Sequence, residues 1–108
     1  MLYKFKSKAA GDLIMLEPNG RRVLQIIGKD PGPKGIIEPD QMPAAIQALE
    51  AAILKEEAEQ QEAIADARAK GQVPPTFAEV SLRQRALPFI DMLTRCQKAG
   101  ADIVWGTP

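Results

Sequence analysis

The chain has 108 residues, enough for one domain with a modest core, and its 14 basic and 14 acidic side chains give a formal net charge of zero. It contains no histidine and one cysteine, which excludes histidine-based catalysis, zinc bound by histidine or several thiolates, and an internal disulfide. No apolar run approaches the roughly 20 residues of a membrane span, and the first residues lack the apolar segment of a signal peptide. We therefore expect a single cytoplasmic domain over residues 1–108, with no membrane partner.

The charge is distributed unevenly along the chain. Residues 1–37 carry seven basic and three acidic side chains, residues 38–70 carry three and eight, and residues 71–108 carry four and three. The acidic middle segment is therefore expected to face basic groups of the first segment, in the same chain or in a second copy. No segment is strongly and exclusively basic, so nucleic acid is not the expected partner.

The first residues predict a strand. Residues 2–6 alternate, with Tyr3 and Phe5 on one face and two lysines on the other, which is typical of a half-buried strand. Residues 13–16 then form a short apolar run, Leu-Ile-Met-Leu. Its length and pattern fit either a second strand or the buried start of a helix.

Glycine and proline residues interrupt helix and strand patterns in the next part of the chain. Residues 18–20, Pro-Asn-Gly, predict a turn, and residues 21–27 then predict a short helix that stops at Gly28. The segment GKDPGPKG at residues 28–35 has the composition of a phosphate loop but not its GxxxxGK[ST] pattern, and its prolines have no amide to donate. An ordinary connection is therefore favoured over an anion site. Residues 35–38 predict a short strand.

Residues 40–70 form the longest helical pattern in the chain. Asp40 is the expected N-cap, Pro43 falls in the first turn where its missing N–H costs nothing, and Gly71 stops the helix. The apolar positions of the first half repeat at spacings of four, three and four, so one face is expected to be buried; these positions are Met42, Ile46, Leu49 and Ile53.

The second half of this helix lacks the apolar pattern that predicts burial in the core. A helix of about 30 residues spans about 45 Å, whereas a compact domain of this size is roughly 35 Å across. The helix therefore overhangs the body, bends, or breaks near residues 56–61. Its second half is rich in acids and keeps one weak apolar seam, Ala63, Ile64 and Ala67. This seam is either a surface for self-association or part of a solvated, fraying helix end.

A surface loop is predicted at residues 71–76, before the last helix. That helix begins at a capping box, either at residues 76–79 or, as we favour, at residues 81–84. Pro88 lies inside the helix and predicts a kink, and residues 102–106 predict a closing strand. The expected buried seam of the helix comprises Leu82, Ala86, Phe89, Leu93 and Cys96. Together these elements predict an α+β fold, in which a small sheet of three to four short strands is covered by three helices and the middle helix is long.

The best candidate for a binding site is the run Arg83, Gln84 and Arg85 in the first turns of the last helix. Basic side chains are unfavourable at the positive end of a helix dipole, so these arginines are expected to meet an anion or an acidic helix. In the competing interpretation both arginines pair with Glu50 or with the acids of residues 56–62, and so fix two helices together. Trp105 is interpreted as core in preference to a binding platform.

No metal site and no cofactor are expected. Glu59, Glu62 and Asp66 share one helix face, but nothing supplies the remaining ligands of a closed site. Cys96 lies on an apolar seam, where a buried structural thiol is the favoured interpretation. An enzyme is the least favoured class of function, because no nucleophile constellation is recognisable.

Three runs of the sequence resemble a known family. They are VSLRQRALPFIDML at residues 80–93, DIVWG at residues 102–106 and MLYKFKSKAA at residues 1–10. The family consists of short, uncharacterised bacterial proteins and is domain-of-unknown-function family 1840; the resemblance covers essentially the whole chain. It implies a cytoplasmic bacterial protein with a small α+β domain and assigns no activity, cofactor or substrate. It also places the family's specific polar residues at Arg83, Gln84 and Arg85, which favours a structural or partner-binding role there.

These observations favour a small cytoplasmic interaction protein without catalytic activity, whose partner is a second copy of the chain or another protein. The alternative is a small-molecule or anion-binding module, in which Arg83, Gln84, Arg85 and Trp105 line a shallow site.

Overall fold

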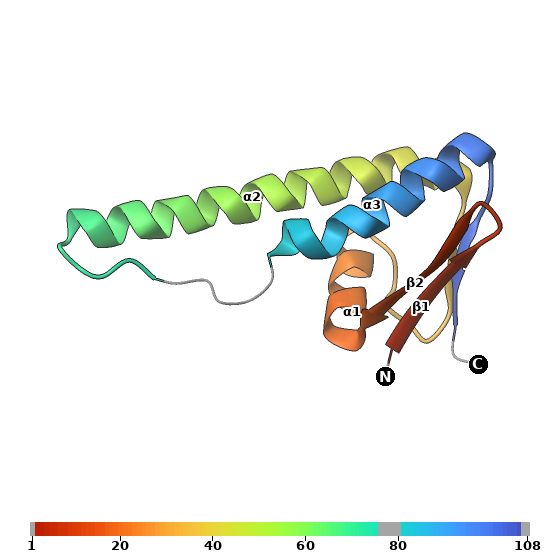
Figure 1. Ribbon diagram of the computed structural model, residues 1–108, viewed down its shortest axis with the longest axis horizontal. Helices are drawn as coiled ribbons and strands as arrows, with labels where there is room; N and C mark the ends of the chain where they lie inside the picture. Colours follow the sequence, from red (N-terminus) through yellow and green to blue (C-terminus); the bar gives the residue numbers. More distant parts are fainter. Residues whose placement is uncertain (1, 76–80, 107–108) are drawn as a thin grey trace.

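The protein is described here by a computed structural model, which places residues 2–75 and 81–106 (Figure 1). The elements follow in the order β1 (Leu2–Ser7), β2 (Ala10–Leu16), α1 (Glu17–Ile26), β3 (Gly35–Ile37), the 3-10 turn η1 (Pro39–Gln41), α2 (Met42–Ala69), α3 (Leu82–Ala99) and β4 (Ile103–Trp105). Four strands and three helices with a long middle helix confirm the predicted α+β fold.

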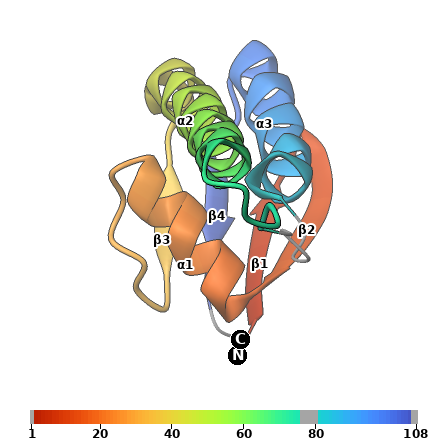
Figure 2. The same ribbon diagram turned by 90° about the vertical axis from the view of Figure 1, so that its left-hand side faces the viewer.

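The four strands form one antiparallel sheet in the order β2-β1-β4-β3. The three helices lie on one side of this sheet (Figure 2). Residues 13–16 belong to β2, so the strand alternative is correct for this apolar run; Leu13 lies opposite Phe5 and Met15 opposite Tyr3. The other side of the sheet exposes Lys4 and Lys6 among apolar side chains, which are Leu2, Ile14, Leu16, Ile36 and Val104.

The core lies between the sheet and the helices and is centred on Phe5. The Phe5 ring packs against Phe89 of α3 and Trp105 of β4, with ring centroids 4.8 and 5.9 Å apart. The seam predicted for the last helix is confirmed, because all five of its members are buried. On α2 the predicted stripe is confirmed for Met42, Leu49 and Ile53, whereas Ile46 is only partly buried.

The predicted start of the first helix is wrong. α1 begins at Glu17 and contains residues 18–20, which we had interpreted as a turn. Pro18 lies in the first turn, where its missing N–H has no intrahelical partner to lose. Gly20 is buried beneath Tyr3, and a β-carbon at this position would overlap the Tyr3 ring. The glycine therefore serves close packing and not a turn conformation.

The predicted N-cap of the long helix is also wrong. Asp40 lies inside η1, and α2 begins two residues later at Met42. A capping box instead opens η1: the Glu38 backbone N–H donates to Gln41 Oε1 at 3.0 Å, and the Glu38 side chain accepts from the Gln41 backbone N–H. The N-cap residue of α2 itself, Gln41, makes no side-chain capping bond to that helix. The capping box lies upstream of Asp40 because Pro39, with its fixed φ, opens the 3-10 turn.

α2 is one continuous helix of 28 residues, so the overhang alternative is correct and no break occurs at residues 56–61. Its second half extends beyond α3 and the sheet (Figure 1), and the molecule measures 53 × 28 × 21 Å. The predicted stop at Gly71 is confirmed: Gly71 has a φ of +70°, and the N–H of Gln72 donates back to Ala67 O at 2.8 Å.

The last helix begins where we favoured it. Ser81 Oγ accepts from the backbone N–H of Gln84 at 3.2 Å, and Gly100, with a φ of +66°, ends the helix. Pro88 lies within α3, where the kink remains a prediction. Of the predicted loop at residues 71–76, the part up to Pro75 contains neither helix nor strand, while the alternative capping box at residues 76–79 lies outside the described residues.

Candidate functional site

Three helices meet at the start of α3, and Glu56 of α2 joins them. Glu56 Oε2 accepts from the backbone N–H of Leu82 at 2.9 Å, and Glu56 Oε1 accepts from Arg22 Nη2 of α1 at 3.1 Å. The first N–H groups of a helix have no partner within it and lie at the positive end of its dipole. A carboxylate from α2 therefore caps α3, while its other oxygen holds α1.

Arg83 makes the second link between α2 and α3. Its Nε and Nη2 each donate to one oxygen of Glu57, both at 2.8 Å, which is the bidentate geometry of a strong charge-assisted pair. These hydrogen bonds hold the pKa of Glu57 below its usual 4.5, and they outweigh desolvation, which raises it. The same bonds raise the pKa of Arg83. The side chains are 46% and 39% exposed, so this is a surface pair.

Arg85 does not behave as the pairing interpretation predicts. Its Nη1 donates to Asn19 Oδ1 of α1 at 2.6 Å, and not to an acid of α2. Arg85 points towards α1 because it lies two residues after Arg83, on a different side of α3. Gln84, between them, is exposed, and its backbone N–H donates to Ser81 Oγ in the helix cap. The run therefore joins two different helices and presents only its middle residue freely to solvent.

Trp105 lies in the core, as favoured. It is 5% exposed, its Nε1 donates to Gly32 O at 3.1 Å, and its ring lies against Gly35 on the neighbouring strand. Tyr3 likewise donates from its hydroxyl to Pro31 O at 2.7 Å, so two core aromatics anchor the loop at residues 28–35. The hydrogen bond and ring contacts of Trp105 thus involve Gly32, Phe5 and Gly35, which lie apart from Arg83, Gln84 and Arg85 in the chain.

The predicted self-association seam is unevenly exposed. Ala63 is exposed, Ile64 is half-buried, and Ala67 is 6% exposed although it lies outside the main core cluster. The described part of the connection after Gly71 folds back beneath this end of α2 (Figure 1). The seam therefore lies on the side to which the chain returns, and the opposite side of the projecting helix faces solvent.

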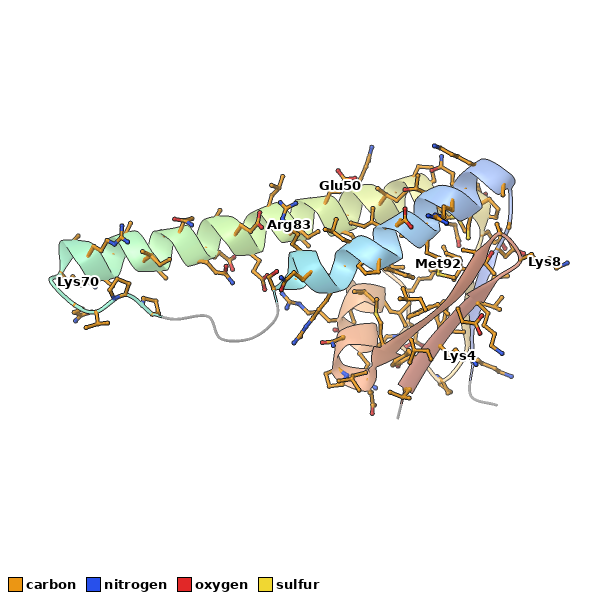
Figure 3. All side chains as sticks on the ribbon, viewed as in Figure 1. Lys4, Lys8, Glu50, Lys70, Arg83 and Met92 are labelled. Atoms are coloured by element: carbon orange, nitrogen blue, oxygen red, sulfur yellow. The ribbon has the colours of Figure 1, made fainter. Side chains whose placement is uncertain are left out.

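A shallow hollow on that opposite side was missed by the sequence reasoning. It lies between α2 and α3, has a volume of about 300 Å³, and is lined by Glu50, Ile53, Leu54, Arg83, Leu87 and Ile90. Leu54 and Leu87 are 62% and 47% exposed. Figure 3 labels Glu50 and Arg83 on this side of the helices. The signal in the sequence was Leu54 itself, a leucine one position off the buried stripe.

The remaining candidates for chemistry lie apart from this region. Among residues 2–75 and 81–106, no three His, Cys, Asp or Glu side chains are arranged to hold a metal ion. Cys96 is buried, and its thiol donates to Ser7 Oγ at 3.1 Å. None of the helices in the part of the chain that the structure describes is both long and apolar enough to cross a membrane.

Comparison with known proteins assigns the chain to a family. A family model described as "Domain of unknown function (DUF1840)" matches residues 1–105. The chain belongs to this family. The match spans both the Ser81–Arg85 run and the closing Trp105, which are the parts that carried the resemblance in the sequence. No curated protein and no solved structure matches the chain.

Proposed function

We propose that the protein is a small cytoplasmic interaction protein that self-associates through the projecting half of α2, residues 58–69, and that it has no catalytic role. The observation that carries this proposal is the projection itself, a helix continued far beyond the body that it helps to form (Figure 1). The single buried cysteine is consistent with a reducing compartment.

The physical argument concerns helix stability. An isolated helix shorter than about 12–15 residues is marginal in water, and helices in proteins derive most of their stability from packing an apolar face. The projecting half continues the packed half and needs no nucleus of its own, but its end can fray. The projecting half is of that length and lies outside the main core cluster, with Ile64 as its only large apolar side chain. Contact with a second copy would supply the packing that the body of the molecule does not reach.

Gel filtration with light scattering tests this proposal. We expect the wild-type mass to rise from the 11.8 kDa of one chain towards twice that value as the concentration enters the high micromolar range. Ala65→Lys should shift the protein towards the monomer, because it places a charge on the solvent-facing side of the projecting half. Ala99→Lys is the matched control, since Ala99 is also an exposed alanine but lies at the end of α3.

Two results would overturn the proposal. One is a wild-type protein that stays a monomer throughout the concentration range. The other is an Ala65→Lys variant that associates as strongly as the wild type and the Ala99→Lys control.

The alternative, an anion- or small-molecule-binding module at Arg83, Gln84 and Arg85, has less support. Both donors on one edge of the Arg83 guanidinium are held by Glu57, and Arg85 is held by Asn19. An anion would have to replace the Glu57 carboxylate to bind there. A thermal-shift series with inorganic phosphate would favour this alternative only if phosphate stabilised the wild type and not Arg83→Ala.

A further inference from the structure

The outer face of α2 carries a regular pattern that the core does not use. Seven exposed positions are spaced alternately by three and four residues, and none of them is charged; they are Ala44, Gln47, Ala51, Leu54, Ala58, Gln61 and Ala65. We refer to these seven residues as the outer seam. The helix carries many charged residues between Glu50 and Asp66, and every one of them lies off this seam.

A three–four spacing is the signature of two helices packed side by side. Apolar or uncharged residues at alternating steps of three and four keep one face of a helix against a partner over several turns. The buried stripe of α2 already packs against the core, so the outer seam is a second, separate face of the same helix. At its middle, Leu54 stands 62% exposed beside Leu87 of α3, which is 47% exposed. These two leucines add apolar surface to a seam of mostly small side chains.

The charges that flank the seam indicate the orientation of the partner helix. Lys55 and Glu62 each follow a seam residue directly, and they lie seven residues apart on the same flank. In an antiparallel pair in which Ala58 faces Gln61 of the second copy, Lys55 of each copy lies beside Glu62 of the other. A parallel pair would instead place Lys55 beside Glu50 of the second copy and Glu62 beside Glu57, whose charge Arg83 already balances. Glu62 would then gain no basic partner, whereas the antiparallel pair gives a partner to both Lys55 and Glu62.

This arrangement also explains the position of the projecting half. The pair is centred between residues 59 and 60 and covers residues 51–68 of each helix, so each projecting half lies along the other. Leu54 of each copy then faces Ala65 of the other, a large residue against a small one. Lys55 and Glu62 form no ion pair with another described residue and remain available for this contact.

We propose that two copies of the chain pair through their outer seams in this antiparallel register, with Lys55 and Glu62 as reciprocal ion pairs. The inference rests on the proposed self-association and adds its contact face, its orientation and its register. The occupant of the seam is a second copy because the flanking charges complement themselves under a two-fold rotation.

Charge exchange tests the register. Lys55→Glu and Glu62→Lys should each weaken the dimer about tenfold, because each places two like-charged pairs across the seam. The double variant Lys55→Glu/Glu62→Lys should restore the wild-type dissociation constant, measured by sedimentation equilibrium. Glu59→Lys is the matched control, since it makes the same charge change at an exposed position away from the flank.

Crosslinking tests the orientation. At about 1.5 Å per residue, the two copies of residue 58 lie only ~4.5 Å apart along the helix axis in this register, whereas the two copies of residue 51 lie ~25 Å apart. A short bismaleimide should therefore join two chains of Ala58→Cys and leave Ala51→Cys as single chains. The wild type, whose Cys96 is buried, gives the background.

The outcomes separate the two proposals. A wild type that never associates overturns both the proposed function and the seam. A wild type that associates, while the charge exchange has no effect or Ala51→Cys crosslinks as well as Ala58→Cys, overturns the antiparallel seam and leaves self-association in place.

Discussion

Gly35 is required by the side chain that lies over it. It pairs with Trp105 across strands β3 and β4, and a β-carbon on Gly35 would overlap the indole ring. In the sequence, Gly35 lies where the segment GKDPGPKG meets the strand predicted at residues 35–38, and nothing there indicates a packing role for it. The close approach became visible only once β3 was placed beside β4, since the two strands are far apart in the chain.

We expect Gly35→Ala to destabilise the protein by about 1–3 kcal/mol, the usual cost of forcing an extra carbon into a packed site. Urea unfolding followed by Trp105 fluorescence measures the effect. Gly11→Ala is the matched control, because a β-carbon there meets no atom within 4 Å. Equal midpoints for the two variants would contradict the packing argument.

Glu56 is a residue that sequence reasoning could not assign. The Ser81, Gly71 and Gly100 caps were predictable because each is local to its own helix. Glu56 instead caps α3 from α2, across 26 positions of the chain. In the sequence it is only one acid among several on an acidic stretch, so the pattern indicated pairing with arginine but not the cap.

Replacing Glu56 by alanine should cost about 1–2 kcal/mol of stability, because the N–H of Leu82 loses its acceptor at a buried helix start. Glu59→Ala removes an equal charge from an exposed position and should change stability by much less. Chemical denaturation of both variants measures their free energies of unfolding. Similar losses of stability in the two variants would show that net charge, and not the missing cap, accounts for the destabilisation.

At the scale of elements, α2 and α3 are joined by one ion pair with a defined pH response. The hydrogen bonds from Arg83 lower the pKa of Glu57 in the folded protein. The stabilisation from this pair is therefore fully present above the usual pKa of 4.5, and it is lost as the pH falls through the lowered value. It should also weaken with added salt, because the pair lies at the surface.

A carboxyl-carbon NMR titration checks this directly. The Glu57 resonance should titrate below 4.5 in the wild type and move back towards 4.5 in Arg83→Gln. An unchanged Glu57 midpoint in Arg83→Gln would contradict the contact.

Element types were predictable where the local pattern had one interpretation. The alternation of Tyr3 and Phe5, the stripe of the first half of α2 and the seam of α3 all identify buried faces correctly. The run at residues 13–16 was ambiguous because four consecutive apolar residues show neither the period of two of a strand nor the period of 3.6 of a helix. The pairing of this run with β1 shows that it is a strand, and that pairing is a tertiary contact which the local sequence does not specify.

At the scale of the whole molecule, the unusual property is its shape. The radius of gyration is 16.1 Å, whereas a compact chain of this length has about 13 Å. The difference follows from α2, whose second half continues past the body (Figure 1). The length of the helical pattern left a choice between overhang, bend and break. The structure shows the overhang, and residues 44–69 contain no glycine or proline that would interrupt the helix.

The candidate contact surface was predictable only in part. The sequence indicated the second half of α2 as the place for self-association, on the basis of its Ala63, Ile64 and Ala67 seam. It did not indicate that the chain returns beneath this seam and leaves the other side of the helix open. That information requires the direction of the turn at Gly71, which local capping signals do not specify.

Amide hydrogen exchange of α2 at two protein concentrations tests the central claim most directly. At low micromolar concentration the amides of residues 58–69 should exchange much faster than those of residues 45–53, which are packed on the core. At high micromolar concentration the projecting half should become protected while the core half stays unchanged. Exchange of residues 58–69 that is independent of concentration would contradict the account.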